Sequence, residues 1–421
     1  MRIRLALLIL AVSSLLSAKE PGWSGLAEVN PPPASDTDRP IALVGATLMD
    51  GGGGPVITDS TVIVRRGRIS AVGKRGDVAI PSNAERIDAA GRFLLPGMFD
   101  AHFHTHDKRR LDSLLSAGFT SLRDPGRPLP VYLDDFLHLR RPLPRAFLTG
   151  PHFDQEPHAH PHNAVDLQTG DQVREKVDEL VAGGASAIKI YYRLPLDLIR
   201  AACERADHHG VPVTAHLELI RADAAIRAGL DGIEHTTSVG TVLASEADAR
   251  EFEQAVAAEN GARDEGRYRL WSRIDLENNP KVNTFIELML ERGVYLVPTL
   301  RPFEPVGDKV TEESLAGFEK IQRFTRMAFE AGVPVLSSSH GPTPEGNWRE
   351  FELLVDAGFT PKEALEAAML PAARFFGVAE RLGSIEVGKA ADLALLDADP
   401  TADIKNVRKV ARVMLNGVWL K

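Results

Sequence analysis

The chain has 421 residues, 44% of them hydrophobic and 25% charged, a globular composition with room for one large domain and a smaller one. This composition excludes a disordered or collagen-like chain. The formal net charge of -9, with no long basic run, argues against a nucleic-acid partner, because phosphate backbones attract a concentrated positive surface. The single cysteine, Cys203, excludes an intramolecular disulfide and a cysteine metal cluster.

Residues 1–18 are arranged like a secretory signal peptide. Arg2 and Arg4 precede an apolar run that ends in small residues, and we expect cleavage near Ala18. The alternative is a membrane anchor, but the apolar run is short for a bilayer span. Residues 19–39 are rich in Pro, Ser and Asp, which predicts a linker. We therefore expect an exported protein, periplasmic or secreted, with no stable membrane association after cleavage.

Short β-branched runs at both ends of the folded part predict a small β-domain. Between Ile41 and Ile87 these runs are separated by Gly-rich turns. The same pattern of short β runs separated by turns recurs near the C-terminus in GSIEVGKAADLALLDADP and VRKVARVMLNGVWL. We expect residues 40–95 and 377–421 to form one composite β-sandwich domain.

Residues 96–376 alternate short apolar runs with amphipathic helical stretches, the pattern of βα units around a parallel sheet. The candidate strands are LPGMFDAHFH, FTSLRD, RAFLTG, ASAIKIYY, VPVTAHL, GIEHT, VYLVPT and VPVLSSS. Eight such units predict an α/β fold with a closed (β/α)8 TIM barrel. In that fold the chemistry lies at the C-terminal ends of the strands.

Histidines and one lysine lie at or near these strand ends. His102 and His104 share one face of the first strand, because side chains alternate along a strand, and two such imidazoles can chelate a metal ion. The same alternation directs Lys189 inward, where an ammonium is costly unless it reaches the rim or pairs with a carboxylate. His216 and His235 end two later strands. A single strand-end histidine is more often structural, but four that converge on one mouth predict a metal site.

The segments LLPGMFDAHFH, AIKIYY, TAH, GIEH and GSIEVGKAADLALLD together resemble the amidohydrolase superfamily, specifically its prolidase-like, imidazolonepropionase-related branch. The resemblance covers the chain beyond the predicted linker. It implies that His102 and His104 bind one metal ion, that carboxylated Lys189 bridges two ions, and that His216 and His235 bind the second. We expect one or two divalent ions, and zinc in particular, because imidazole-rich sites suit zinc.

The eighth predicted strand departs from the pattern of this family. Where the resemblance implies an aspartate that ligates a metal ion and takes a proton from water, GVPVLSSSHGPTP places Ser338, Ser339 and His340. His340 therefore stands in for the aspartate and is, with His235, a candidate for catalysis as well as for metal binding. An imidazole that ligates a metal ion has no second lone pair to take the proton.

Two further segments are expected to lie over the mouth of the barrel. HFDQEPHAHPHNAV places His152, His158, His160 and His162 in the loop after the third strand. These side chains could touch substrate or a metal ion, but a solvated polar loop is the favoured interpretation. Residues 241–280 are charged and helix-prone, which suits a lid, a dimer-facing excursion or a plain solvated helix.

The sequence thus predicts a metal-dependent hydrolase of amide-type bonds in a small-molecule substrate such as a dipeptide, an N-acyl amino acid or a cyclic amide. One alternative is a catalytically silent binding protein that lost turnover with the aspartate. Another is a non-hydrolytic amidohydrolase-like protein, such as an isomerase or a decarboxylase. A homo-oligomer is compatible with the sequence.

Overall fold

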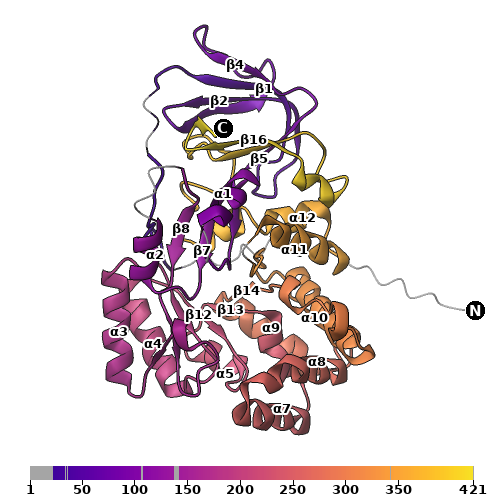
Figure 1. Cartoon of the computed structure of the whole chain (residues 1–421). Helices are drawn as coiled ribbons and strands as arrows, with labels where there is room; N and C mark the ends of the chain where they lie inside the picture. The colour runs from indigo at the N-terminus through magenta and orange to yellow at the C-terminus, as the bar shows by residue number, and fades with distance from the viewer. Residues whose placement is uncertain are drawn as a thin grey trace, which may run out of the picture.

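The computed structural model describes residues 22–33, 35, 37–105, 108–136, 142–341 and 343–420. The predicted signal peptide and part of the predicted linker lie outside the described residues. Within those residues, no helix is both long and apolar enough to cross a membrane. Figure 1 shows a small β-rich region above a larger region of parallel strands and helices.

Strands from both ends of the chain pair in one eight-stranded sheet, in the order β17-β16-β15-β5-β1-β2-β3, with β4 paired to β1. Their bounds are β1 (Ile41–Leu48), β2 (Ile57–Arg65), β3 (Arg68–Lys74), β4 (Glu85–Asp88), β5 (Phe93–Pro96), β15 (Leu393–Leu396), β16 (Val410–Leu415) and β17 (Val418–Trp419). The two ends join at the antiparallel pair β5–β15, where Leu94 lies opposite Leu395. The two ends of the chain therefore meet in one β-rich region, as predicted.

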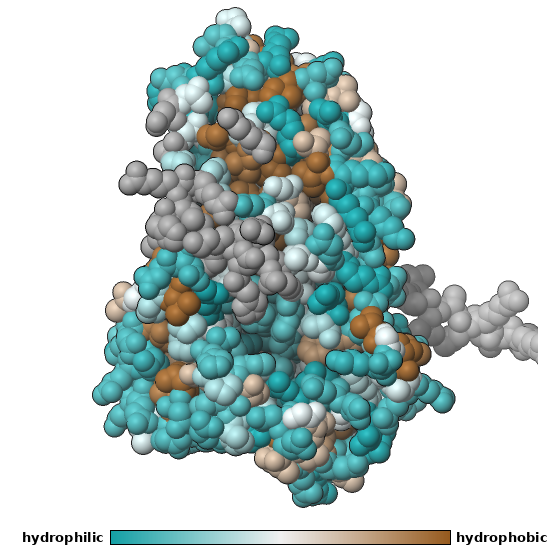
Figure 2. Space-filling model, viewed as in Figure 1, coloured by the Kyte–Doolittle hydropathy of each residue, from teal (hydrophilic) through white to brown (hydrophobic). Residues whose placement is uncertain are grey.

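A hydrophobic cluster holds this sheet together. Leu43 of β1 and Val62 of β2 are direct cross-strand partners, and both pack with Leu94, Leu395 and Met414. Full burial of each such side chain stabilises the fold by roughly 1.5–3 kcal/mol. Figure 2 shows hydrophobic residues on the outer surface of this region too, whereas the surface of the larger region is mostly hydrophilic.

The larger region contains two groups of parallel strands, β6-β7-β8 and β10-β9-β11-β12-β13-β14. Their bounds are β6 (Met98–Asp100), β7 (Phe119–Asp124), β8 (Arg145–Leu148), β9 (His152–Asp154), β10 (Ala164–Asp166), β11 (Ile188–Ile190), β12 (Val213–His216), β13 (Gly232–Glu234) and β14 (Tyr295–Val297). All of the segments predicted as barrel strands, except the last, contain one of these strands. The sequence thus locates the parallel strands by their short apolar runs.

The last predicted strand, VPVLSSS, contributes only an isolated parallel bridge between Val335 and Leu296. Two features of its sequence explain the short pairing. Pro334 has no N–H to donate to a ladder, and the backbone N–H of Ser339 donates to the Asp100 carboxylate at 3.2 Å. Side-chain acceptors therefore take the place of a regular ladder where this segment reaches the mouth.

Helices follow most of the parallel strands and cover them (Figure 1). They are α1 (Lys108–Ser116), α2 (Leu129–Phe136), α3 (Gly170–Ala182), α4 (Leu196–His209), α5 (Ala222–Arg227), α6 (Gly240–Leu243), α7 (Glu246–Ala258), α8 (Arg263–Arg273), α9 (Pro280–Arg292), α10 (Glu312–Glu330), α11 (Pro344–Asp356), α12 (Pro361–Glu366) and α13 (Leu370–Phe375). In α4, Ile199, Ala202 and Ala206 recur at helical spacing and are buried. This helix ends at Gly210, whose φ of 66° favours glycine.

The segment predicted as charged and helix-prone, residues 241–280, contains α7 and α8 and lies between β13 and β14. α8 packs against both α7 and α10. Its inner face buries Trp271 completely, and the Tyr268 hydroxyl donates to the Phe303 carbonyl at 2.9 Å. The helices α7 and α8 thus form a packed layer, and the inner side of this layer is part of the hydrophobic core.

Candidate metal centre

A cavity of ≈ 440 Å³ lies where the parallel strands end. It is lined by all of the residues that the sequence nominated for the site, namely His102, His104, Lys189, His216, His235 and His340. They come from β11 and β12 and from the residues just beyond β6, β13 and the isolated bridge at Val335. Strand ends from distant parts of the chain thus bring these side chains to one place.

Three imidazoles lie close enough together to share one ion. The ligand nitrogens of His102, His235 and His340 all lie within 4.8 Å of one another. The ring of His104 lies 4.8 Å from that of His340, and the ring of His216 lies 4.5 Å from that of His235. We call these five residues the histidine cluster. The group of three that could share one ion therefore contains one histidine from each ligand pair that the family resemblance implies, His102 and His235, together with His340.

Hydrogen bonds outside the cavity fix the tautomers of two cluster members. His102 Nδ1 lies 2.7 Å from Glu234 Oε2, and a carboxylate can only accept, so Nδ1 carries the proton. His235 Nδ1 bonds to the hydroxyl of Thr299, which donates its own proton to the Pro298 carbonyl and therefore accepts from the histidine. In both rings the lone pair of Nε2 is left for a ligand in the cavity.

His216 is oriented in the same manner but through its other nitrogen. Its Nε2 lies 2.9 Å from Glu218 Oε1, and the same oxygen accepts from Arg267 Nη2 at 3.1 Å. Donation to Glu218 leaves the Nδ1 lone pair of His216 available. Burial lowers the pKa values of His102, His216, His235 and His340 well below the usual value of histidine. These four members of the cluster are therefore neutral imidazoles, the form that binds metal ions.

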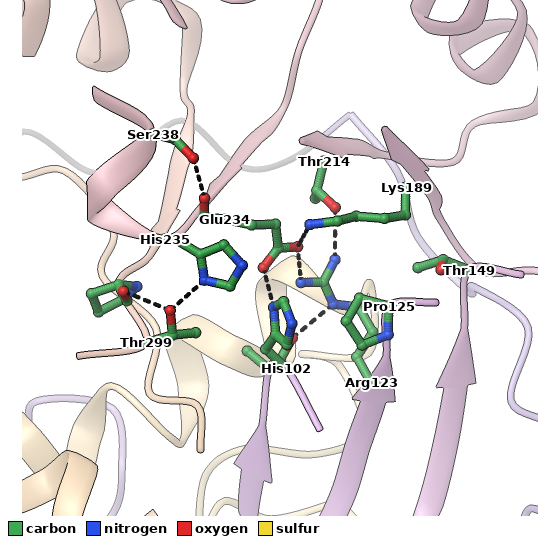
Figure 3. A network of polar contacts seen from close by, with 12 residues as sticks. His102, Arg123, Pro125, Thr149, Lys189, Thr214, Glu234, His235, Ser238 and Thr299 are labelled. Atoms are coloured by element: carbon green, nitrogen blue, oxygen red, sulfur yellow. Dashed lines mark hydrogen bonds and ion pairs between the residues drawn. The ribbon is translucent and has the colours of Figure 1, made fainter. Parts of the chain in front are cut away.

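Lys189 projects from β11 into a buried charge network that Figure 3 shows from close by. Its side chain is 1% exposed, and Nζ lies 3.8 Å from Glu234 Oε1. Among the described residues, the amine has no hydrogen-bond partner. Burial lowers the pKa of Lys189 to about 7. A buried polar atom without a hydrogen bond is costly, so this position favours a further group on or beside the amine.

Glu234 and Arg123 are the principal residues that the sequence interpretation missed. The Arg123 guanidinium pairs with Glu234, and its Nη1 donates to Thr214 at 3.1 Å (Figure 3). Burial acts to raise the pKa of Glu234, but the charges of Arg123 and Lys189 hold that pKa below its usual value. Glu234 thus remains an anion that can accept from His102. The sequence did contain a signal for both residues, because each is a charged residue inside a short apolar strand. Arg123 lies in FTSLRD and Glu234 lies in GIE.

Backbone geometry also marks the site. His235, Thr299 and His340 have φ values of 66°, 47° and 48°, a left-handed region that residues with a Cβ rarely adopt. Such strain persists where surrounding contacts hold it and is concentrated at functional sites. The backbone N–H of His340 donates to the carbonyl of His102 at 2.9 Å, and the two rings stack at 4.7 Å. His340 therefore enters the cavity.

Ser339, the residue before His340, faces away from the ion-binding nitrogens. Its hydroxyl donates to Asp100 Oδ2 at 2.6 Å, and Asn347 Nδ2 donates to the same oxygen at 2.8 Å. This buried network fixes the turn that presents His340. It lies under the cavity and does not line it.

The loop predicted to carry four histidines is more ordered than a solvated loop. His152 lies in β9 and is only 4% exposed, and its ring stacks on Tyr191 at 4.8 Å. His152 and His160 line the cavity, whereas His158 faces Asp154, with 3.6 Å between Nδ1 and Oδ2. The segment is held by backbone pairing between β9 and β10. The irregular spacing of its histidines gave no sign of these two strands.

Residues 93–420 match the amidohydrolase family, so the chain belongs to that family. Among solved structures it is similar to a putative prolidase from Bifidobacterium longum, with 27% identity, a TM-score of 0.69, and coverage of 91% of this chain and 95% of that chain. The fold is therefore α/β with parallel strands, as predicted.

Curated relatives match shorter stretches. A dihydroorotase from Anaeromyxobacter dehalogenans is 28% identical over 213 residues, 46% of this chain and 47% of the relative. An imidazolonepropionase from a Bradyrhizobium species is 48% identical over 61 residues, 14% of this chain and 15% of the relative. The chain matches about half, or less, of the length of these relatives. Together with the prolidase, they confirm the resemblance to the prolidase-like, imidazolonepropionase-related branch.

Proposed function

We propose that this chain is a metal-dependent hydrolase of amide-type bonds. The observation that carries the proposal is the convergence of the histidine cluster and Lys189 on one cavity, with lone pairs directed by partners outside it. Family membership supports cleavage of carbon–nitrogen bonds. Relatives named as prolidase, dihydroorotase and imidazolonepropionase support a small-molecule amide, such as a dipeptide, an N-acyl amino acid or a cyclic amide.

The donor set fits a divalent ion, and zinc in particular, because neutral imidazoles are preferred zinc ligands. His102, His235 and His340 lie close enough together to hold one ion. For a two-ion site the family resemblance supports His102 and His104 on one ion and His216 and His235 on the other, with carboxylated Lys189 between the two. Carboxylation fits the unpartnered amine of Lys189, since it replaces a costly buried cation with an anion that two metal ions neutralise.

When bound, a divalent ion would supply Lewis-acid activation of water and of the amide carbonyl. The residues of the chain orient the site. Glu234 holds the proton on His102 Nδ1, and Thr299 does the same for His235. A ligating His340 keeps no lone pair for the proton of the water. Among the described residues that line the cavity, Asp264 alone carries a carboxylate.

That shortage of proton acceptors favours a second candidate function. A catalytically silent or non-hydrolytic amidohydrolase-like protein needs no base at the position of His340. The two candidates share the metal site and differ in whether the protein hydrolyses amides.

We also infer that the parallel strands close into a (β/α)8 barrel over residues 96–376, with 40–95 and 377–421 as the appended domain. Backbone hydrogen bonds between the strand groups support closure. They run from Ser186 N to Leu148 O (2.8 Å), from Leu336 N to Leu296 O (2.9 Å) and from Ala101 N to Ser337 O (3.1 Å). Export through residues 1–18 and assembly into a homo-oligomer rest on the sequence alone.

The test combines metal analysis with a substrate panel. Purified protein is assayed for bound divalent ions and for hydrolysis of dipeptides, N-acyl amino acids and cyclic amides. The proposal expects a stoichiometric ion and turnover that a chelator removes and zinc restores. A protein that holds the ion but hydrolyses none of the amides supports the silent alternative. A protein that binds no divalent ion contradicts both.

A further inference from the structure

One guanidinium that lines the cavity has no carboxylate partner in the part of the chain that the structure describes. Arg263, the first residue of α8, lies there with Tyr191 and His160. Its Nη1 donates to the Tyr191 hydroxyl at 3.1 Å, and the guanidinium lies 5.1 Å from the centroid of the Tyr192 ring. No carboxylate in the described part of the chain forms an ion pair with it. Most of its N–H donors are thus available to a ligand.

Arg267 lies one turn further along α8 and lines the same cavity, but it differs from Arg263 because carboxylates of the protein pair with it. Its Nη2 pairs with buried Glu218 at 3.1 Å, and its Nη1 lies 3.9 Å from Asp264. Arg267 is therefore paired directly with carboxylates of the protein, whereas Arg263 feels the charge of Glu218 only from beyond ion-pair distance. A partly buried cation without a counter-ion favours an anionic ligand.

The helix that carries Arg263 is held rigidly. Gly317 of α10 lets the backbone of α8 approach so closely that a Cβ there would lie 2.5 Å from the carbonyl oxygen of Tyr268. Tyr268 is further tied to Phe303 by a hydrogen bond of 2.9 Å. With the helix backbone packed in this way, the contacts of Arg263 with Tyr191 and Tyr192 hold the guanidinium in the cavity before any ligand arrives, which lowers the entropic cost of binding.

We propose that Arg263 binds a carboxylate of the substrate, so that the substrate is an amide carrying a free carboxylate group. The inference rests on the proposed function. A guanidinium recognises a carboxylate through two parallel N–H donors. Tyr191 accepts from Arg263 and can donate its own O–H to the same anion. The ring of Tyr191 lies 4.8 Å from that of His216, which links this anion site to the histidine cluster.

The inference narrows the substrate class. Dipeptides and N-acyl amino acids that end in a carboxylate fit it, and so does a cyclic amide that bears an acid group. Neutral amides, ureas and carbamates lack the group that Arg263 would hold. These compounds would forgo the charge-assisted hydrogen bonds that Arg263 offers to a carboxylate.

The test uses matched amides. N-acetyl amino acids are compared with the N-acetyl alkylamines that lack only the carboxylate, using the parent, Arg263→Gln and Arg269→Gln. Arg269 is the control because it lies on the same helix, is exposed and pairs with Glu313 at 3.5 Å. We expect Arg263→Gln to lower kcat/KM for the acids by about tenfold or more. Turnover of the neutral amides should be unchanged, and Arg269→Gln should alter neither class.

Failure of this inference is distinguishable from failure of the hydrolase proposal. If the parent hydrolyses both classes equally and Arg263→Gln changes nothing, the carboxylate site is wrong and the hydrolase stands. If the parent hydrolyses no amide, calorimetric binding of the same acids still tests Arg263. Weaker binding to Arg263→Gln alone supports the site, and equal binding to all three proteins overturns it. Arg263→Lys, which keeps the charge without the paired donors, replaces Arg263→Gln if the latter unfolds.

Discussion

The histidine cluster and the Arg263–Arg267 face of α8 line the same cavity but are built differently. The cluster lies at the ends of parallel strands, where backbone pairing fixes each position. The α8 face comes from a helical excursion between β13 and β14. Four members of the cluster, His102, His216, His235 and His340, are neutral imidazoles, whereas α8 carries permanent charge. We therefore propose that the strand ends supply the chemistry and that the inserted helix selects the substrate.

The largest effect is expected beneath the cluster, at Glu234. Glu234→Gln leaves the buried charges of Arg123 and Lys189 without their shared anion. Loss of one partner from a buried charge network costs about 3–5 kcal/mol of unfolding free energy. Urea denaturation measures this cost. Glu313→Gln, which breaks an exposed pair with Arg269, is the control and should change stability by under about 1 kcal/mol. Equal stability of both variants would show that the network contributes little.

The next effect concerns turnover at His340. His340→Asp offers a spare oxygen to accept the proton of the water and partly neutralises a bound metal, so we expect hydrolysis to rise by up to about 100-fold, or to appear where none is seen. His340→Asn has a similar size without a base and serves as the control. If His340→Asp binds metal normally but loses activity that the parent has, the histidine is a working part of an altered mechanism.

A smaller effect is expected at the opposite end of the same strands, at Asp231. Its Oδ2 accepts from the N–H of Val213 at 2.8 Å, and burial raises its pKa to about 7. The pKa of the folded state lies above that of the unfolded state. The stability contributed by the protonated form is therefore full below about pH 4 and is lost as the pH rises through 7.

Asp231→Asn removes this titration and keeps an acceptor for Val213. Between pH 5 and pH 8 the parent should lose about 2 kcal/mol of unfolding free energy relative to the variant. Thermal or urea unfolding at the two pH values measures the difference. Parallel curves for the two proteins would mean that the Asp231 carboxyl titrates normally.

The sequence predicted the parallel strands and the cluster well for a physical reason. Alternation along a strand fixes which side chains share a face, so His102 and Lys189 could be directed inward without knowledge of the fold. The same reasoning did not find Glu234, because its function depends on Arg123 from a strand far away in sequence. Pairing across strands is a tertiary property that one segment does not encode.

The sequence also left the role of α8 open. A charged helix looks the same in sequence whether its charges face water or a cavity, so Arg263 could not be separated from exposed Arg269. Ser338, Ser339 and His340 all stood near the position of the expected aspartate. The contact of Ser339 with Asp100 is what distinguishes it from His340.

Zinc binding to metal-free protein, measured by competition with a chromophoric chelator, tests the central claim most directly. The parent is compared with His102→Ala, from the cluster, and with His160→Ala, which removes another histidine of the same cavity. Loss of His102 should weaken zinc binding by about 100-fold or more, whereas loss of His160 should leave it unchanged. Equal weakening by both substitutions, or no zinc binding by the parent, would contradict a metal centre built on the strand-end cluster.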